Sequence, residues 1–270
     1  MSRARAGEAA ALARSVAPRA ATFRTVSTPI ELVAAFAEHL RPAGLDLVAP
    51  FSVRDYGARV PARYRLPLFG RDDALGVVVG NTRALWEPFV ASLASEPRGL
   101  RSLHPLDRYV ERAVNASLAS LGARHQVRWA HARLSRLVAI QRAAYVAGLA
   151  FDAPCRLAIH PRHGLWIGLR AAIAFDLAPA FGAPGSTEPP APHPCDGCAT
   201  RPCVPAFEGA LAATGGRRGC DVSPWQAVRD ACPLAPHARY DDPEIRYHYT
   251  KDRAVLRVAA ATQACSTKVR

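Results

Sequence analysis

The amino-acid sequence predicts an α+β domain in which helices flank a largely antiparallel sheet, followed by a cysteine-rich C-terminal appendage. Apolar runs with the period of a strand are mixed with runs of helical period, and hairpin-type connections separate some of them. The chain of 270 residues is 50% hydrophobic and 21% charged, so it can bury a full core. Five of its seven cysteines lie between residues 195 and 232, which marks the appendage.

The first predicted helix begins at Thr28-Pro29 and ends near Leu40. Threonine before proline, with Glu31 in the first turn, is typical of a helix start. Residues 44–70 are interrupted by prolines and should be extended. Their larger apolar residues could line a groove: Val48, Phe51, Val60, Tyr64 and Leu66.

Strands and helices then alternate. The predicted elements are a buried strand at 75–80, a helix after Thr82, a helix from His104-Pro105 to near Gly122, a short strand at 127–130 and an apolar helix over 134–150. The last of these helices contains Ala143, Ala144, Ala147 and Gly148, which are small enough for another backbone to approach closely.

A polar corner, His160-Pro161-Arg162-His163-Gly164, separates two strand-like runs. Residues 156–160 alternate with period two, and residues 165–175 are too apolar for an exposed edge, so we expect a hairpin with a buried second strand. Pro161 fixes its own φ and Gly164 permits a positive one, which would aim Arg162 in a set direction. Trp166 begins the return strand.

The cysteines follow a segment rich in proline, alanine and glycine at 178–194. Their spacing is Cys195-x2-Cys198-x4-Cys203, with Cys220 and then Cys232-Pro233. In a chain without a secretory signal, this density favours metal binding over disulfides. We expect Cys195, Cys198, Cys203 and Cys232 to ligate one centre, either a [4Fe-4S] cluster or zinc, with Cys220 dispensable; a metal-free remnant is the other interpretation.

The net charge of +13 comes from arginines scattered along the whole chain, since all but two of its 35 basic residues are arginine. Without a recognisable nucleic-acid motif, we expect small anionic groups rather than nucleic acid as partners. No apolar run of about 18 residues and no secretory signal is present, so we expect no membrane association and a cytoplasmic location.

These features divide the chain into five parts. They are a flexible N-terminus (1–27), a core (28–176), a linker (177–194), a cysteine-rich segment (195–236) and a C-terminal segment that packs back on the core (237–270).

Several stretches, in the same order along the chain, resemble the MMACHC (CblC) family of cobalamin-processing proteins. The corner and Trp166 resemble the family's IHPR-x-G-x-W signature. The other matching stretches are Gly44–Leu47, Pro50–Val53, Tyr64–Leu68, Ala143–Gly148 and, more loosely, residues 225–256. Tyr145 departs from the family pattern, which has histidine there.

The resemblance implies a nitroreductase-like fold that binds cobalamin (vitamin B12) and processes its upper axial ligand. The reactions would be reductive decyanation, with electrons from FMN, FAD or an electron-donor protein, and dealkylation by a small thiol such as glutathione. It implies contacts to cobalamin from Tyr145, Gly148, His160, Trp166 and Tyr240. It also implies that Arg162, Arg229 and Arg253 bind the carboxylates of the thiol, a task suited to planar guanidinium groups.

Two other functions remain open at this point. One is a cobalamin-dependent iron–sulfur reductase related to epoxyqueuosine reductase, whose cobalamin domain resembles this family and which carries a ferredoxin-like segment. The other is a non-enzymatic corrinoid carrier. The cobalamin-processing scheme that the resemblance implies requires no catalytic cysteine or histidine.

Overall fold

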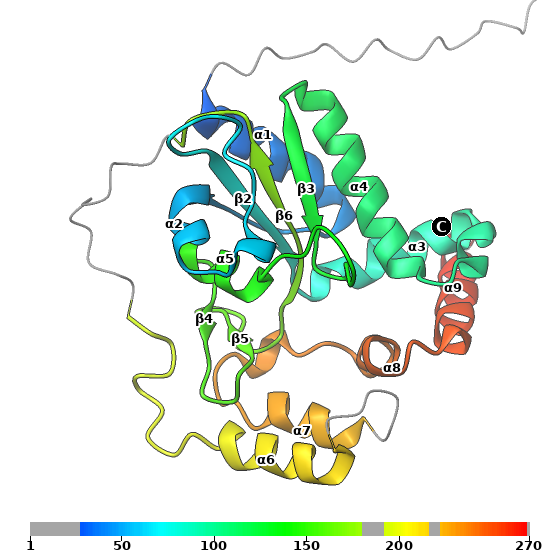
Figure 1. The fold of residues 1–270 in the computed structure, drawn as a ribbon. Coiled ribbons are helices and arrows are strands. Elements are labelled where there is room, and N and C mark those ends of the chain that lie inside the picture. Colours follow the sequence, from blue (N-terminus) through cyan, green and yellow to red (C-terminus); the bar gives the residue numbers. More distant parts are fainter. Residues whose placement is uncertain (1–27, 180–191, 216–221, 269–270) are drawn as a thin grey trace, which may run out of the picture.

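The structure, a computed structural model, describes residues 28–179, 192–215 and 222–268 (Figure 1). Its central sheet is antiparallel throughout and has four strands in the order β1, β2, β6, β3. These strands are β1 (Leu47–Ser52), β2 (Leu75–Asn81), β3 (His125–Trp129) and β6 (Gly168–Phe175). Two shorter strands, β4 (Phe151–Asp152) and β5 (Ala158–Ile159), form a separate small sheet. The predicted α+β class with an antiparallel sheet is confirmed.

Nine α-helices surround the two sheets in the described part of the chain. They are α1 (Pro29–Leu40), α2 (Val53–Ala58), α3 (Trp86–Ser95), α4 (Pro105–Leu121), α5 (Ile140–Val146), α6 (Cys203–Thr214), α7 (Ser223–Asp230), α8 (Asp242–Thr250) and α9 (Arg253–Lys268). Short 3-10 turns occupy 41–43, 62–64, 83–85, 97–101 and 236–238. No helix among the described residues is both long enough and apolar enough to cross a membrane.

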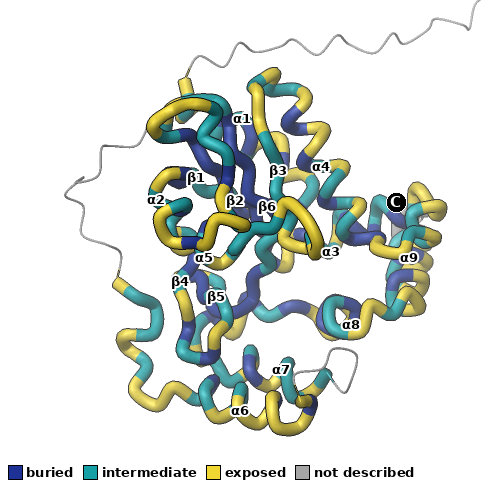
Figure 2. Tube along the Cα trace, viewed as in Figure 1, coloured by how far each residue is buried: buried dark blue, intermediate teal, exposed yellow. Residues whose placement is uncertain are grey.

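The hydrophobic core lies on both faces of the central sheet (Figure 2). In β2 every residue is buried, and successive side chains point to opposite faces. Val77 and Val79 pack with the helices α1, α3, α4 and α9, whereas Val78 packs with α2 and α5. A strand buried on both faces must be apolar at every position, which is why residues 75–80 show no alternation in the sequence.

Local sequence signals set several helix ends as expected. The Thr28 hydroxyl accepts the Glu31 N–H, and the Glu31 carboxylate accepts the Thr28 N–H, which completes a capping box at the start of α1. Thr82 caps the turn before α3, and Gly122 ends α4 in the left-handed conformation. These predictions, and the strands at 75–80 and 127–130, are confirmed to within two residues.

The predicted helix over 134–150 is wrong over its first six residues. Arg136 has a φ of 53°, a left-handed conformation that interrupts any helix there. The Ala139 N–H donates to the Tyr56 hydroxyl at 2.9 Å, so the chain enters α5 from an extended approach. The helix runs only from Ile140 to Val146, and Gly148 reverses the chain beyond it with a φ of 64°.

The predicted hairpin across the corner is also wrong in its pairing. Arg156 has a φ of 61° and closes a tight turn with Ala153, so β5 folds back on β4. The apolar run after the corner becomes β6 only at Gly168, and β6 inserts between β2 and β3. Insertion at the sheet centre explains why this run is so continuously apolar.

The cysteine-rich segment packs beneath the small sheet. Helices α6 and α7 lie side by side and cover β4, β5 and the start of the return from the corner (Figure 1). The chain then passes through α8 to α9, which packs against α3 on the other side of the molecule. The corner therefore lies where the central sheet, the small sheet and the cysteine-rich segment meet.

Candidate functional site

The corner is a tight turn organised by the His160 side chain. The backbones of His160 and Gly164 exchange two hydrogen bonds of 2.9 Å, which close the loop. Inside it, His160 Nδ1 accepts the N–H of Arg162 at 3.0 Å and that of His163 at 3.3 Å. The imidazole satisfies the inner donors of the turn, and Pro161 contributes no donor that would need a partner.

Burial keeps His160 neutral. Only 6% of the residue is exposed, and this burial, with the neighbouring His163 and Arg162, lowers the pKa of His160 to about 4. A neutral ring can keep a lone pair on Nδ1 for the two backbone donors. His160 therefore shapes the corner, while Arg162 stands exposed at its tip.

Gly164 allows the corner to touch the segment after α7. Its φ is 56°, and a Cβ built there would lie 2.4 Å from the carbonyl oxygen of Leu234. Real Cβ atoms do not approach a carbonyl so closely. A glycine is thus required both by conformation and by packing, and it links the corner to the chain two residues after Cys232.

Trp166 lies in a small buried cluster with Tyr240, at a ring-centroid distance of 5.5 Å. The guanidinium groups of Arg229 and Arg239 each lie 5.6 Å from the centroid of the Trp166 ring. Arg229 Nε also donates to the Tyr249 hydroxyl at 3.0 Å, and its Nη1 donates to the Leu165 carbonyl. Arg229 is therefore held in place by partners on both sides.

A buried polar cluster adjoins these aromatic rings. Glu244 in α8 is 1% exposed, and its Oε1 lies 3.4 Å from Nε2 of His248, one turn along the helix. Burial raises the pKa of Glu244 to about 8 and lowers the pKa of His248, so both are neutral near neutral pH. The His248 ring in turn packs 5.6 Å from that of Tyr240.

The Tyr240 hydroxyl has no hydrogen-bond partner in the described part of the chain, although it is buried. Burial, ahead of nearby charges, raises the pKa of this phenol, so it remains a donor. A buried hydroxyl without a partner is costly, at about 1–3 kcal/mol, and calls for an explanation such as a bound molecule.

Tyr145 and Gly148 lie at another place, at the exposed C-terminal end of α5. Tyr145 is 38% exposed, packs edge-on against Phe151 and carries the Arg142 guanidinium 5.1 Å from its ring centroid. A Cβ at Gly148 would meet no atom within 4 Å, so this rim is open. Beside it, the segment that follows α2, the start of α5 and β4 enclose a groove of about 370 Å³ that Val60 and Tyr64 help to line.

The three arginines expected to bind a thiol lie on three different elements. Arg162 is at the tip of the corner, Arg229 in α7 and Arg253 at the start of α9. Arg253 donates to the backbone carbonyl of Ser102, next to α3 and far along the chain from the corner. Within the described residues no hydrogen bond, ring contact or shared pocket joins the three, so their convergence stays a prediction.

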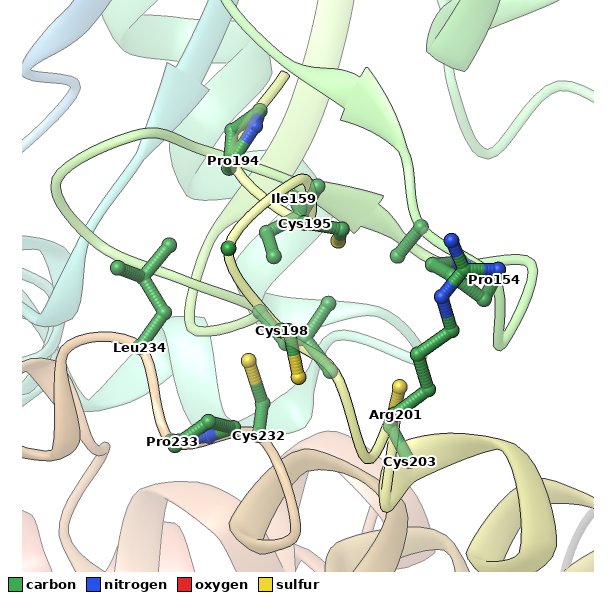
Figure 3. Close-up of a pocket in the computed structure, with 13 residues that line it drawn as sticks. Pro154, Ile159, Pro194, Cys195, Cys198, Arg201, Cys203, Cys232, Pro233 and Leu234 are labelled. Carbon is green, nitrogen blue, oxygen red and sulfur yellow. The ribbon is translucent and has the colours of Figure 1, made fainter. Parts of the chain in front are cut away.

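The structure does bring four cysteines together. Cys195, Cys198, Cys203 and Cys232 line one cavity of about 220 Å³ (Figure 3). Burial raises the pKa of Cys195 and of Cys232. No group of three or more His, Cys, Asp or Glu side chains in the described ranges is arranged so that it could hold a metal ion.

A fifth thiol beside this cavity was not expected from the sequence. Cys155 is fully buried, and burial, with a smaller effect of the neighbouring Cys203, raises the pKa of the Cys155 thiol to about 12. Cys155 lies 40 residues before Cys195 and belongs to no spaced motif, so only the turn between β4 and β5 reveals it. Cys220 lies outside the described residues.

Comparison with known proteins shows a similarity in structure and none in sequence families or curated proteins. No family model matches the sequence, and no curated protein matches it. Among solved structures, the crystal structure of the C. elegans B12-trafficking protein CblC, a human MMACHC homologue, superposes with a TM-score of 0.61 at 15% sequence identity. The match covers 85% of this chain and 96% of CblC. The chain therefore has the fold of CblC.

Proposed function

We propose that the protein binds cobalamin and processes its upper axial ligand. The observation that carries this proposal is the CblC fold, shared over 85% of the chain. The second support is that the stretch resembling the family signature, the corner with Trp166, lies at the junction of the central sheet, the small sheet and the cysteine-rich segment.

Residues of the chain fit such a ligand at two places. The unpartnered Tyr240 hydroxyl could donate to one of the amide groups around a corrin ring. The open rim at Tyr145 and Gly148 could face the flat macrocycle, because Gly148 has no side chain and the Tyr145 ring is exposed beside it. His160 and Trp166 are almost fully buried and would shape the wall between these places.

The groove beside α5, at about 370 Å³, lies near the lower end of the range of ligand pockets, ~300–1,000 Å³. A corrinoid is larger than the molecules for which that range is typical, so it would fill the groove and project beyond its rim. We propose that exposed arginines then receive the anionic co-substrate, glutathione or a similar thiol, with Arg162 as the first contact.

The cofactor would supply the reactive cobalt, and the chain would bind, orient and exclude water. For thiol-dependent dealkylation, the thiolate must approach the cobalt-bound carbon in line, which positioning of the thiol's carboxylates by guanidinium groups would favour. For reductive decyanation, a reduced flavin or a donor protein would supply electrons. We propose both reactions as activities of the same site.

The experiment that tests binding is an absorbance titration of the full chain with cyanocobalamin. We expect the spectrum to change to the form in which the lower axial base has left cobalt. Tyr240→Phe removes only the unpartnered hydroxyl and should weaken binding about 2- to 13-fold, the equivalent of one hydrogen bond of ~0.5–1.5 kcal/mol. An unchanged spectrum at saturating protein would contradict the proposal.

The four-thiol cavity favours a second candidate function, a cobalamin-dependent iron–sulfur reductase. In that case the protein should reduce its substrate with an electron donor alone, and added thiol should make no difference. Methylcobalamin dealkylation that depends on thiol concentration would instead support the first candidate.

A further inference from the structure

We propose that the cavity between the small sheet and helices α6 and α7 binds a four-iron iron–sulfur cluster through Cys195, Cys198, Cys203 and Cys232. The proposal concerns a second site, and it holds or fails independently of cobalamin binding. It rests on how the thiols are presented, on what surrounds them and on the space between them.

The fold presents each thiol on a short, constrained segment. The Cys198 N–H donates to the Cys195 carbonyl at 3.1 Å, so the first two cysteines lie on one tight turn. The Cys195 N–H donates to Nδ1 of His193 at 3.1 Å, which fixes the start of that turn. Cys203 is the first residue of α6, and Cys232 lies just beyond the end of α7. Packing of α6 against α7 brings Cys232 to the other three.

Apolar residues of the core domain complete the wall of the four-cysteine cavity. Ile159 and Leu165, which flank the corner, line the cavity together with Ala153 and Leu234. Leu165 and Leu234 thus border the same space as Cys232. An apolar wall that limits solvent exposure is one of the features that set the stability and potential of iron–sulfur clusters.

The space between the thiols suits a cluster better than a single ion. Zinc requires its sulfur ligands within ~2.3 Å of one point, whereas a four-iron cluster takes its four thiolates around a larger core. The four thiols line a single cavity of about 220 Å³, which leaves room for a core between them. A core of four irons and four sulfides would occupy this space, with each iron bound by one of the four thiolates.

Four cysteines are also the number that such a cluster needs. Cys155 does not line the cavity. Cys265 lies exposed on α9, which packs elsewhere, against α3. Cys265 therefore serves as a matched control for any cysteine substitution.

The test uses the full chain, purified without oxygen and incubated with ferric and ferrous iron, sulfide and a thiol reductant. We expect about four irons and four acid-labile sulfides per chain, with visible absorption that fades on reduction. Each Cys→Ser substitution at 195, 198, 203 or 232 should lower iron content at least twofold, whereas Cys265→Ser should retain all of it. One zinc and no iron per chain, or full iron content in all four variants, would overturn the proposal.

A second measurement does not depend on whether the variants fold. Wild-type protein, loaded as above, is alkylated under native conditions and its modified cysteines are identified by mass spectrometry. The four ligands should be protected by loading and should react once iron is chelated, while Cys265 reacts in both states. Equal reactivity of Cys198 and Cys232 with and without iron would overturn the proposal as well. No step uses cobalamin, so failure here leaves cobalamin binding and processing untouched and removes only the second candidate, the iron–sulfur reductase.

Discussion

The buried Glu244 should make the stability of the protein fall as pH rises, and Glu244→Gln should remove that dependence. Glu244 is held in its protonated form by burial in α8, where its Oε1 faces Nε2 of His248 at 3.4 Å. A protonated carboxyl can donate to the neutral imidazole, and the amide of glutamine can do the same. The variant therefore keeps the contact and loses only the titrating proton.

The magnitude follows from the difference between folded and unfolded pKa values. The pKa of Glu244 rises from 4.5 to about 8 on folding, so between these values the folded state binds one proton more than the unfolded state. Each pH unit in this window then lowers the free energy of unfolding of the wild type by about 1.4 kcal/mol. Over the whole window the wild type should lose on the order of 4 kcal/mol relative to Glu244→Gln.

Urea unfolding of both proteins at a series of pH values measures this difference. Glu111→Gln is a matched control, because Glu111 forms the same kind of pair, 3.0 Å from Nε2 of His131, but in partial contact with solvent. Glu111→Gln should change the free energy of unfolding by no more than about 1 kcal/mol at every pH. The reasoning would be refuted if the difference in free energy of unfolding between wild type and Glu244→Gln did not change with pH. It would also be refuted if that difference favoured the wild type more as pH rises.

Three further predictions concern the corner and its neighbours. Gly164→Ala should lower the free energy of unfolding by at least about 2 kcal/mol, and Gly148→Ala by about 1 kcal/mol, as measured by chemical denaturation. Both positions need a left-handed conformation, but only a Cβ at 164 meets the carbonyl of Leu234, so equal losses would mean that this contact is unimportant. His160→Asn keeps an acceptor for the turn but removes the titrating imidazole. As pH falls from 6.5 to about 4, the free energy of unfolding of the wild type should therefore fall by on the order of 3 kcal/mol relative to the variant, measured by the same method, and parallel pH profiles would disprove this. Arg162→Ala should raise the thiol concentration needed for methylcobalamin dealkylation about 10- to 100-fold and leave the affinity for cobalamin nearly unchanged. If the variant dealkylates at the wild-type rate at low thiol concentration, Arg162 does not bind the thiol.

The sequence carries enough information to predict the elements whose signals are local. Thr28 and Glu31 form a capping box that depends only on residues three apart, and the all-apolar run from Leu75 to Gly80 can only be a strand buried on both faces. The cysteine pattern singled out Cys195, Cys198, Cys203 and Cys232, and these four line one cavity; that they bind one metal centre stays a prediction.

Pairing partners and interior positions were not predictable in the same way. The turn at Arg156, with its positive φ in a residue other than glycine, is imposed by packing, so the alternation before the corner suggested the wrong hairpin. Trp166 and Tyr240 matched a family pattern, but the pattern could not show that they pack on each other inside the protein. The pair formed by Glu244 and His248 had no sequence signal beyond a spacing of four residues.

Leu165 connects the two proposed sites through its backbone and its side chain. Its carbonyl accepts a hydrogen bond from Arg229, whose guanidinium group lies over the Trp166 ring. Its side chain lines the four-thiol cavity. A ligand that orders Cys232 would therefore restrict the residue that immediately follows the corner, and through it the position of Arg229. Because such coupling acts equally in both directions, cluster loading that changes cobalamin affinity must be matched by an equal effect of cobalamin on cluster retention.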